Sequence, residues 1–329
     1  MADDKAWRPL DRPELGGLDS ISRMIHVEEW RDPELLTSLR LGPKLFIASD
    51  YGGEHPSSRY RSLSFLVADS MFLWLWDRDR TQIRRSVLGD SRRMGYKSLG
   101  DRRRARALIP FLRAADTIPG LLATFLIDKR VRTLFQEYPG DHGRALVARE
   151  NWRPGSFEKL LRVAHLGAML VSGLCAPDQH VIWITDQDEI VSNITKHREA
   201  TAVIGNCLNH LVNHSMGHFR LATTQSDTGK RDLEDLAAIP DLAAGSLADV
   251  ASLMASRGGF PSKGHLRRPE NGIPKKAIAI LGWLADPRHT LKRITICVEF
   301  VPPDGFRSSL LRMSLGPSTS TSLIMNPNL

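Results

Sequence analysis

The chain has 329 residues, of which 42% are hydrophobic and 25% are charged, as in an ordinary soluble globular protein. Its formal net charge of +8 and its pI of about 9.6 indicate a polyanionic partner or substrate, such as nucleic acid. The three cysteines, Cys175, Cys207 and Cys297, are far apart, which argues against a disulfide framework or a zinc knuckle and fits a reducing compartment.

The sequence shows no sign of export or of a membrane partner. Its first residues, Met-Ala-Asp-Asp-Lys, are polar and acidic, unlike those of a signal peptide. The longest apolar stretch, around residues 166–176, is too short to cross a bilayer. We therefore expect a cytoplasmic protein.

Residues 1–40 are polar and rich in Asp, Glu, Arg and Pro, and we interpret them as an N-terminal extension. A strand is predicted at 44–49, where an apolar run leads to Asp50 and breaks at two glycines. Open α/β sheets place their ligands at such strand ends, although Asp before glycines is also typical of a plain turn. Two more strands, at 60–67 and 71–76, would complete an antiparallel meander.

The most basic part of the chain extends from residue 84 to residue 106. Arginine forks match phosphate oxygens, so one interpretation is a loop that contacts phosphates. The alternative is a solvated helix face, but acidic residues are too sparse in this stretch for ion pairs to account for most of the arginines. The candidate nucleic-acid-binding residues are Arg92, Arg93, Lys97, Arg102, Arg103 and Arg104, together with the more distant Lys129.

Two later apolar runs also end in a carboxylate, the first in Asp128 and the second in Asp186. Helical segments separate them, and a last helix carries Asp241 near its expected start. The predicted elements are a helix at 105–116, a strand at 121–127, a helix at 157–174, a strand at 180–185, a helix from 192 or 195 to about 215, a strand at 217–224 and a helix from about 239 to 258.

The later strands are expected to lie parallel to the first, because strand–helix–strand connections are right-handed almost without exception. Asp50 and Asp128 would then end two neighbouring parallel strands. Neighbouring strands are about 4.8 Å apart, so one divalent ion would reach both carboxylates.

Four short motifs mark this order of elements. They are Asp50-Tyr-Gly-Gly53, Leu126-Ile-Asp128-Lys129, Ile184-Thr-Asp186 and Pro240-Asp241-Leu-Ala-Ala-Gly245. They resemble an uncharacterised bacterial and phage family of the ribonuclease H-like superfamily, whose members carry Asp-Glu-Ser-Gly, Asp-Lys and Ala-Asp-Leu-x-Ala-Gly motifs. Lys97, in Tyr96-Lys-Ser-Leu-Gly100, resembles a lysine that this family often has before its first helix. The resemblance covers about residues 41–256, and its frequent presence in phages and mobile elements suggests a role in genome conflict.

The resemblance implies an α/β fold with a mixed five-stranded sheet, a three-strand antiparallel meander plus parallel strands, flanked by helices. It also implies that carboxylates hold two Mg²⁺ or Mn²⁺ ions about 4 Å apart for phosphodiester hydrolysis. The Glu that follows the first Asp in the family is Tyr51 here, so either Glu54 takes its place or the site lacks one ligand. The implied catalytic and metal ligands are Asp50, Asp128, Asp186 and Asp241, with Asp188 as a substitute for Asp186.

Each acid also has a structural explanation that needs no metal. Asp241 in a first helical turn would complement the helix dipole, and Asp186 and Asp188 would cap the helix that follows them. Asp128 would pair with Lys129 or with a neighbouring arginine in a surface turn.

Residues 257–329 are interpreted as a C-terminal addition, with a helix at 274–284, a strand at 293–301, a second strand near 310–315 and a flexible tail. The terminal additions are candidate surfaces for a protein partner. The leading hypothesis is a metal-dependent nuclease that acts on DNA or RNA. The alternative is a non-catalytic module of the same fold that binds nucleic acid or protein, an alternative to which Tyr51 gives weight.

Overall fold

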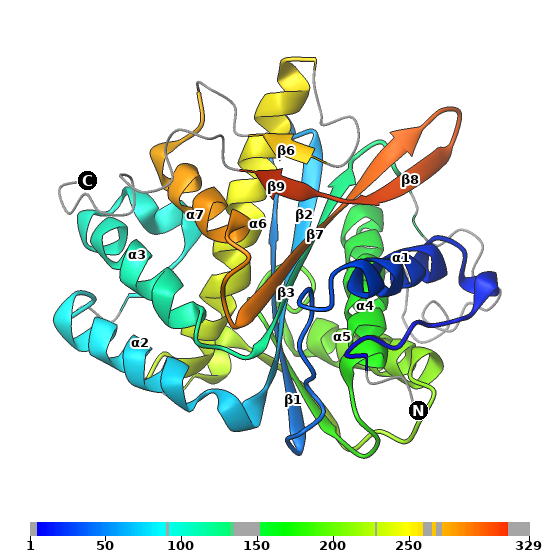
Figure 1. Cartoon of the computed structure of the whole chain (residues 1–329), viewed down its shortest axis with the longest axis horizontal. Helices are drawn as coiled ribbons and strands as arrows, with labels where there is room; N and C mark the ends of the chain where they lie inside the picture. Colours follow the sequence, from blue (N-terminus) through cyan, green and yellow to red (C-terminus); the bar gives the residue numbers. More distant parts are fainter. Residues whose placement is uncertain are drawn as a thin grey trace.

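The structure, a computed structural model, describes residues 5–89, 92–132, 134, 152–227, 229–258, 265–267 and 272–314. Its main feature is a mixed β-sheet with helices on both faces (Figure 1). The strands of this sheet are β1 (Lys44–Gly52), β2 (Tyr60–Asp69), β3 (Gly120–Asp128), β4 (His180–Thr185), β5 (Phe219–Thr223), β7 (Leu291–Val301) and β8 (Gly305–Leu310). The helices are α1 (Gly17–Arg31), α2 (Trp74–Ser86), α3 (Arg102–Ala115), α4 (Pro154–Leu174), α5 (Ile194–Leu211), α6 (Asp232–Ser256) and α7 (Lys275–Ala285). Two short strands, β6 (His265–Arg267) and β9 (Arg312–Ser314), pair separately.

The strand order of the main sheet is β5-β4-β1-β2-β3-β7-β8. β2 lies antiparallel between β1 and β3, while β4 and β5 continue in parallel from β1. On the other side, β7 is parallel to β3 and β8 is antiparallel to β7. The expected α/β class is confirmed, and the sheet has seven strands rather than the five expected.

The prediction of a strand at 71–76 is wrong, because this segment belongs to a helical turn and to the start of α2. Asp69 ends β2, and its carboxylate accepts a hydrogen bond from the N–H of Met71 at 3.0 Å. Trp74 is exposed, whereas Trp76 is buried against α3. Trp74 and Trp76 point in different directions because residues two apart do so on a helix. An apolar run of six residues is too short for its pattern to distinguish a helix from a strand.

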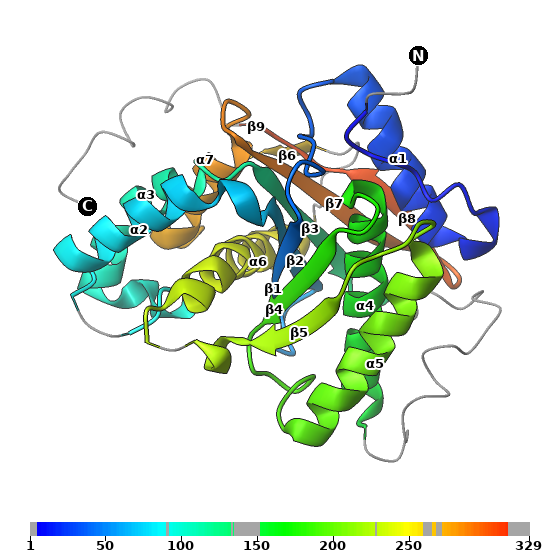
Figure 2. The same cartoon turned by 90° about the horizontal axis from the view of Figure 1, so that it is seen from below.

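The two faces of the sheet carry different helices (Figure 2). α1, α4 and α5 cover one face, and α2, α3, α6 and α7 cover the other. Along β1, Leu45 and Ile47 pack into the first layer, and Phe46 and Ala48 pack into the second. Side chains alternate across a strand, so Asp50 continues the second series and faces α6.

α6 is a single helix that begins at Asp232, well before the expected start near Ile239. Pro240 lies inside it, so Asp241 is in the middle of the helix and its interpretation as a first-turn residue is wrong. Three other acidic residues occupy the first turn and complement the helix dipole there. Among the described helices, α6 is the one long and apolar enough to cross a membrane, and 72% of that window is buried, as in a core helix.

The segments expected as terminal additions are built into this core. Trp7 is 1% exposed, its indole N–H donates to the carbonyl of Ser22 in α1 at 3.0 Å, and its ring covers Gly173 of α4. At the other end of the chain, β7 and β8 extend the main sheet beyond β3. The expected flexible tail lies outside the described residues, which end at 314.

The packing of α4 on β4 leads to a stability prediction for Gly167→Ala. A Cβ at this position would overlap the indole ring of Trp183, which is fully buried and donates to Ser49 Oγ at 2.9 Å. We expect the variant to be less stable by about 1–3 kcal/mol, as overpacked cores usually are. Gly155→Ala in the same helix is the matched control, because no described atom lies within 4 Å of its added Cβ. Thermal melting of the two variants checks this, and an equal effect of both would contradict it.

Candidate functional site

Three of the predicted carboxylates converge at the end of β1, on the face that α6 covers. β1 and β4 run in parallel with Ser49 opposite Thr185, so Asp50 and Asp186 follow at one level of two neighbouring strands. Such strands are about 4.8 Å apart. Asp241 approaches from α6, closely enough that its charge acts directly on Asp50. We call Asp50, Asp186 and Asp241 the carboxylate cluster.

Glycines allow α6 to approach β1 at this point. A Cβ on Gly52 would lie 2.7 Å from the carbonyl oxygen of Ala244, and a Cβ on Gly245 would overlap the ring of Tyr96. Gly53 has a φ of +76°, a conformation that other residues rarely adopt. The glycines of the first and last motifs are therefore explained by close packing beside the cluster.

Asp50 and Asp241 are held by backbone N–H groups. Asp50 Oδ1 accepts from the N–H of Tyr51 at 2.6 Å, and Asp241 Oδ2 accepts from the N–H of Tyr96 at 2.6 Å. Among the described residues, neither carboxylate forms an ion pair with a lysine or an arginine. Their negative charges are thus only weakly compensated.

Both of these carboxyl groups have raised pKa values. Burial, together with the charges of Asp241 and Asp186, raises the pKa of Asp50 well above its usual value despite a backbone hydrogen bond. Burial likewise raises the pKa of Asp241, although a backbone hydrogen bond and the charge of Arg93 oppose this. Two like charges in one buried site disfavour full ionisation, so a cation bound beside the pair would stabilise it.

Asp186 differs because Arg93 neutralises it. The Arg93 Nη1 and Nη2 atoms donate to the two carboxylate oxygens at 2.9 and 2.7 Å. Thr224 Oγ1 donates to Asp186 Oδ1 at 2.8 Å. Burial raises the pKa of Asp186, but the bonds from Arg93 outweigh burial and lower the pKa below its usual value. The pair faces solvent, with 43% of the Arg93 side chain and 29% of the Asp186 side chain exposed.

Asp128 lies outside the carboxylate cluster, so its expected place beside Asp50 is wrong. β2 separates β1 from β3, and the two strands are therefore not neighbours. Asp50 is opposite Ser64 of β2, which is opposite Thr124 of β3, four residues before Asp128. At the usual strand geometry this offset is about 13 Å along β3, in addition to about 10 Å across two strand spacings.

Asp128 instead pairs with neighbouring arginines, as its structural explanation predicts. Its carboxylate is 1% exposed and accepts bonds from Arg59 at 3.1 Å and from Arg130 at 2.8 Å. Burial raises the pKa of Asp128, but the hydrogen bonds from Arg130 and Arg59 outweigh burial and lower it. The residue therefore stabilises the end of β3.

Glu54 and Asp188 do not join the cluster either, because they lie on the opposite face of the sheet. Lys159 of α4, whose side chain is 5% exposed, holds Glu54 at 3.2 Å and Asp188 at 2.8 Å. The Lys159 ammonium also lies 4.7 Å from the ring centroid of Tyr51. Glu54 thus does not replace the glutamate that Tyr51 displaces, and Asp188 is no substitute for Asp186.

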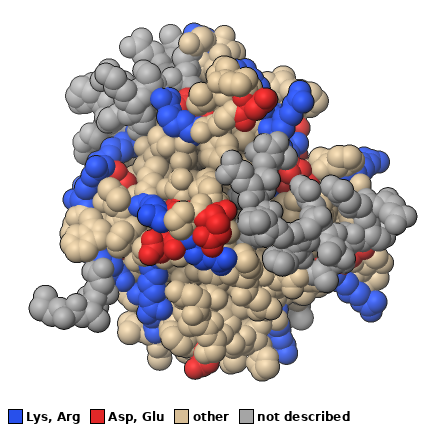
Figure 3. Space-filling view, turned by 90° about the vertical axis from the view of Figure 1, so that its right-hand side faces the viewer, with Lys and Arg blue, Asp and Glu red and all other residues tan. Residues whose placement is uncertain are grey.

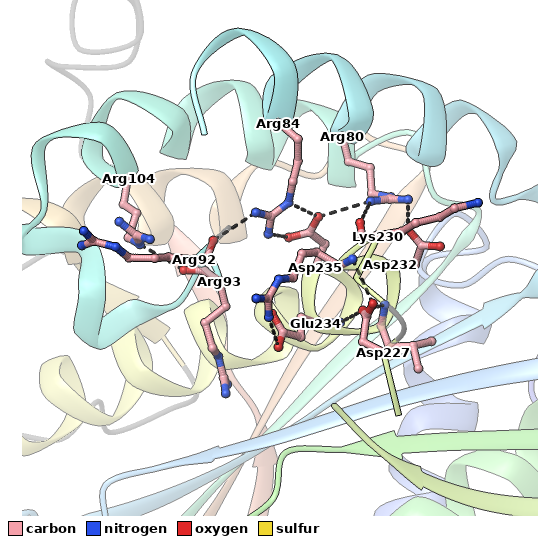
Figure 4. Close-up of polar contacts among 12 residues, drawn as sticks. Arg80, Arg84, Arg92, Arg93, Arg104, Asp227, Lys230, Asp232, Glu234 and Asp235 are labelled. Carbon is pink, nitrogen blue, oxygen red and sulfur yellow. Dashed lines mark hydrogen bonds and ion pairs between the residues drawn. The ribbon is translucent and has the colours of Figure 1, made fainter. Parts of the chain in front are cut away.

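Several arginines of the basic stretch pair with acids that are distant in sequence (Figure 4). Arg84 Nε donates to Asp235 Oδ2 in α6 at 2.8 Å. The Arg93 side chain extends toward the sheet in the same view. Its Nη2 donates to Asp186 Oδ2 at 2.7 Å. Arg104 is 2% exposed and donates to the carbonyl of Arg93 at 3.0 Å. Arg84 and Arg93 thus have acidic partners outside the basic stretch, which the count of nearby acids did not include. Arg104 pairs with Asp101 of the same stretch at 2.9 Å, and the prediction that Arg104 contacts nucleic acid is wrong because it is buried.

Of the other predicted cations, Lys129 is partly buried and the rest are exposed. Lys129 donates to the carbonyl of His55 at 2.6 Å. Figure 3 draws the side of the molecule that carries α1, α4 and α5, opposite to α3, and basic and acidic side chains are interspersed on that side. The exposed candidates for phosphate contact are Arg92, Lys97, Arg102 and Arg103.

Two residues support the site without having been predicted to do so. Thr224 directly follows β5, and its position after a parallel strand is a usable signal, since such strand ends meet at one edge. Tyr96 holds Asp241 through its N–H, and its hydroxyl donates to Asp249 at 2.6 Å. No local pattern marks Tyr96, because its partners lie more than a hundred residues away.

Comparisons with protein-family models, with curated proteins and with solved structures find no match to this chain. Among the described residues, no three His, Cys, Asp or Glu side chains are arranged to hold a metal ion. Arg93 supplies a physical reason, because it occupies both oxygens of Asp186. Asp50 and Asp241 remain as two acids whose charges interact, and the third acid, Asp186, is bound by an arginine.

Proposed function

We propose that the chain is a metal-dependent nuclease with a ribonuclease H-like core, acting on DNA or RNA. The observation that carries the proposal is the convergence of Asp50, Asp186 and Asp241 from three separate motifs at one sheet edge. The strand arrangement also supports it. A meander of β1, β2 and β3, continued in parallel by β4 and β5, agrees with the sheet that the sequence resemblance implies.

The donor set fits a hard divalent cation. All three side chains offer carboxylate oxygens, which Mg²⁺ and Mn²⁺ prefer, and Mg²⁺ keeps several of its own waters. Asp50 is buried and Asp241 partly buried, the two carboxylates repel one another, and among the described residues neither forms an ion pair with a lysine or an arginine. They would hold the ion, and Asp186 would join them once it is released from Arg93.

A bound divalent ion would supply an activated water and would stabilise the leaving oxygen of a phosphodiester. The chain's own residues would bind and orient the substrate. The exposed cations Lys97, Arg102 and Arg103 are placed on the segment that begins beside Asp241 and enters α3, where they would contact the phosphate backbone without reading its sequence. Tyr96 would keep Asp241 in place through its N–H.

A non-catalytic nucleic-acid-binding module is the second candidate. It is favoured by Tyr51, which replaces an acidic residue, and by Glu54, which Lys159 holds on the wrong face of the sheet. The cluster therefore has three carboxylates and no fourth from these positions. Such a module would bind nucleic acid through the same exposed cations without cleaving it.

The deciding experiment is a cleavage assay with labelled single- and double-stranded DNA and RNA, in Mn²⁺, in Mg²⁺ and in EDTA. We expect metal-dependent cleavage by the wild type and its loss in Asp241→Asn. Asp128→Asn is the matched control, because this buried aspartate lies outside the cluster, and it should keep its activity. Binding without cleavage by the wild type would support the non-catalytic module, and loss of activity in Asp128→Asn alone would overturn the assignment of the site.

A further inference from the structure

We infer that Arg93 is a resident counter-ion of Asp186 that a divalent cation displaces, after which its guanidinium binds a phosphate group of the nucleic acid. This inference rests on the proposed function and adds an order of events at the same site: the cation binds first, and Arg93 then moves from Asp186 to the phosphate. Arg93 donates to both carboxylate oxygens of Asp186. A cation therefore has to compete with Arg93 before it gains Asp186 as a ligand.

The exposure of the pair makes this exchange feasible. Arg93 and Asp186 are 43% and 29% exposed, and ion pairs open to solvent contribute little to stability because water screens them. Asp50, by contrast, is 8% exposed and has the negative charge of the partly buried Asp241 beside it, so the two attract any cation that reaches them. A divalent ion bound at the cluster would be attracted by all three carboxylates, whereas Arg93 donates hydrogen bonds to one of them.

The backbone at Arg93 is fixed, so only the side chain needs to move. The buried Arg104 donates to the carbonyl of Arg93 at 3.0 Å, and Arg84 donates to the carbonyl of Arg92 at 3.0 Å (Figure 4). Met94, the next residue, is fully buried. The Arg93 guanidinium thus changes partner by side-chain rotation about a fixed backbone, and it stays near the ion that replaces it.

A phosphate is the natural new partner for the released guanidinium. Its planar fork matches two phosphate oxygens as well as it matches two carboxylate oxygens. Lys97 lies exposed on the following turn and acts electrostatically on Asp241, so a second cation faces the same place. The positive charge that the metal-free protein uses to neutralise Asp186 would then serve the substrate.

The first test measures Mn²⁺ affinity by isothermal titration calorimetry, without nucleic acid, for the wild type, Arg93→Gln and Arg93→Lys. Removal of the competing charge should tighten Mn²⁺ binding about two- to fivefold in Arg93→Gln, the effect expected from a solvent-exposed ion pair. Arg93→Lys keeps the positive charge but loses the two-pronged guanidinium, so its Mn²⁺ affinity should lie between that of the wild type and that of Arg93→Gln. Arg106→Gln, in which an exposed arginine of α3 loses the same charge, should bind Mn²⁺ as the wild type does.

The outcomes of this titration separate the inference from the proposed function. Wild-type Mn²⁺ binding that Arg93→Gln does not tighten would overturn the inference and leave the nuclease proposal standing. Binding by Arg93→Gln where the wild type shows none would support the inference, since Arg93 would then block the ion. Absence of binding in both proteins would overturn both.

The second test addresses the phosphate. In Mn²⁺, Arg93→Gln should bind a labelled phosphorothioate DNA duplex, chosen to resist cleavage, about tenfold more weakly than the wild type. The slope of log affinity against log salt concentration should be shallower by about 0.9, the value for one lost phosphate contact. In EDTA, where Asp186 retains Arg93, the two proteins should bind this duplex equally. Equal affinity in Mn²⁺ as well would overturn the phosphate step.

Discussion

Asp50→Asn is expected to abolish metal-dependent cleavage and, in metal-free buffer, to raise the melting temperature. Cleavage should fall about 10³-fold or more, because a metal contributes several kcal/mol of transition-state stabilisation and each 1.36 kcal/mol is a tenfold change in rate. The same substitution should stabilise the metal-free protein by about 0.5–2 kcal/mol, the usual range for a single favourable change. A binding residue is thus expected to weaken the fold that carries it.

The sign of the stability effect follows from the raised pKa of Asp50, which burial causes first and the charge of Asp241 second. Between the usual pKa of 3.8 and the raised value in the folded protein, the folded state holds the proton more tightly than the unfolded chain does. The free energy of unfolding therefore falls as the pH rises through that window, and the penalty is complete above it. Asparagine has nearly the same shape and does not ionise, so the penalty disappears in the variant.

Asp128→Asn supplies a control of the opposite sign. The pKa of Asp128 is lowered, since the bonds from Arg130 and Arg59 outweigh burial. This carboxylate contributes stability above its usual pKa of 3.8 and loses it as the pH falls through the lowered value. At pH 7, Asp128→Asn should therefore melt below the wild type while Asp50→Asn melts above it. Melting in EDTA at pH 5 and pH 8, then with Mn²⁺, checks both; destabilisation by Asp50→Asn at pH 8 would contradict the electrostatic account.

The sequence predicts the bounds of β3 and β4 well, because both strands have a strong local pattern. β3 and β4 are continuous apolar runs that end in a carboxylate, and their expected bounds agree with the structure to within about one residue. The meander is harder, because its third strand follows its second only after α2 and α3 have intervened. The aromatic run at 71–76 fits the local pattern of a strand, and only its packing on α3 makes it helical.

The site is only partly predictable from the sequence. The order of the motifs along the chain does not determine which strands are neighbours or which residues face one another across them. Asp50, Asp186 and Asp241 meet as expected, yet Asp128 has an equally good strand-end motif and lies two strands away. The acidic partners of the arginines could not be predicted from the sequence either. Arg93 and Asp186 are 93 positions apart and Arg84 and Asp235 are 151 apart, so counting acids near the basic stretch underestimates the number of ion pairs.

The largest stability loss is expected from Asp235→Asn, at the start of α6. Asp235 is fully buried and receives two bonds from Arg84 of α2, with Arg80 at 3.5 Å. Removing its charge leaves the guanidinium of Arg84, whose side chain is 13% exposed, without its main anion. Breaking a buried pair on one side typically costs about 3–5 kcal/mol. Burial raises the pKa of Asp235 despite the bonds from Arg84 and Arg80, so the loss comes from the buried guanidinium of Arg84 and not from the carboxylate itself. For this reason, and since Arg80 keeps Asp232 as a partner, we expect a value near the lower end.

Asp232→Asn is the matched control, since its carboxylate also pairs with Arg80 but is 46% exposed. Its loss should cost at most about 1 kcal/mol, as for a solvent-exposed pair. Urea unfolding of both variants checks the difference. The double variant Asp235→Asn/Arg84→Met should recover part of the loss, because it also removes the guanidinium that Asp235 neutralises in the wild type. A double variant whose loss equals the sum of the two single losses would show that the pair itself is not what joins α2 to α6. Arg84 also donates to the carbonyl of Arg92. The double variant therefore loses one of the two hydrogen bonds that fix the backbone from which the Arg93 side chain reaches the carboxylate cluster.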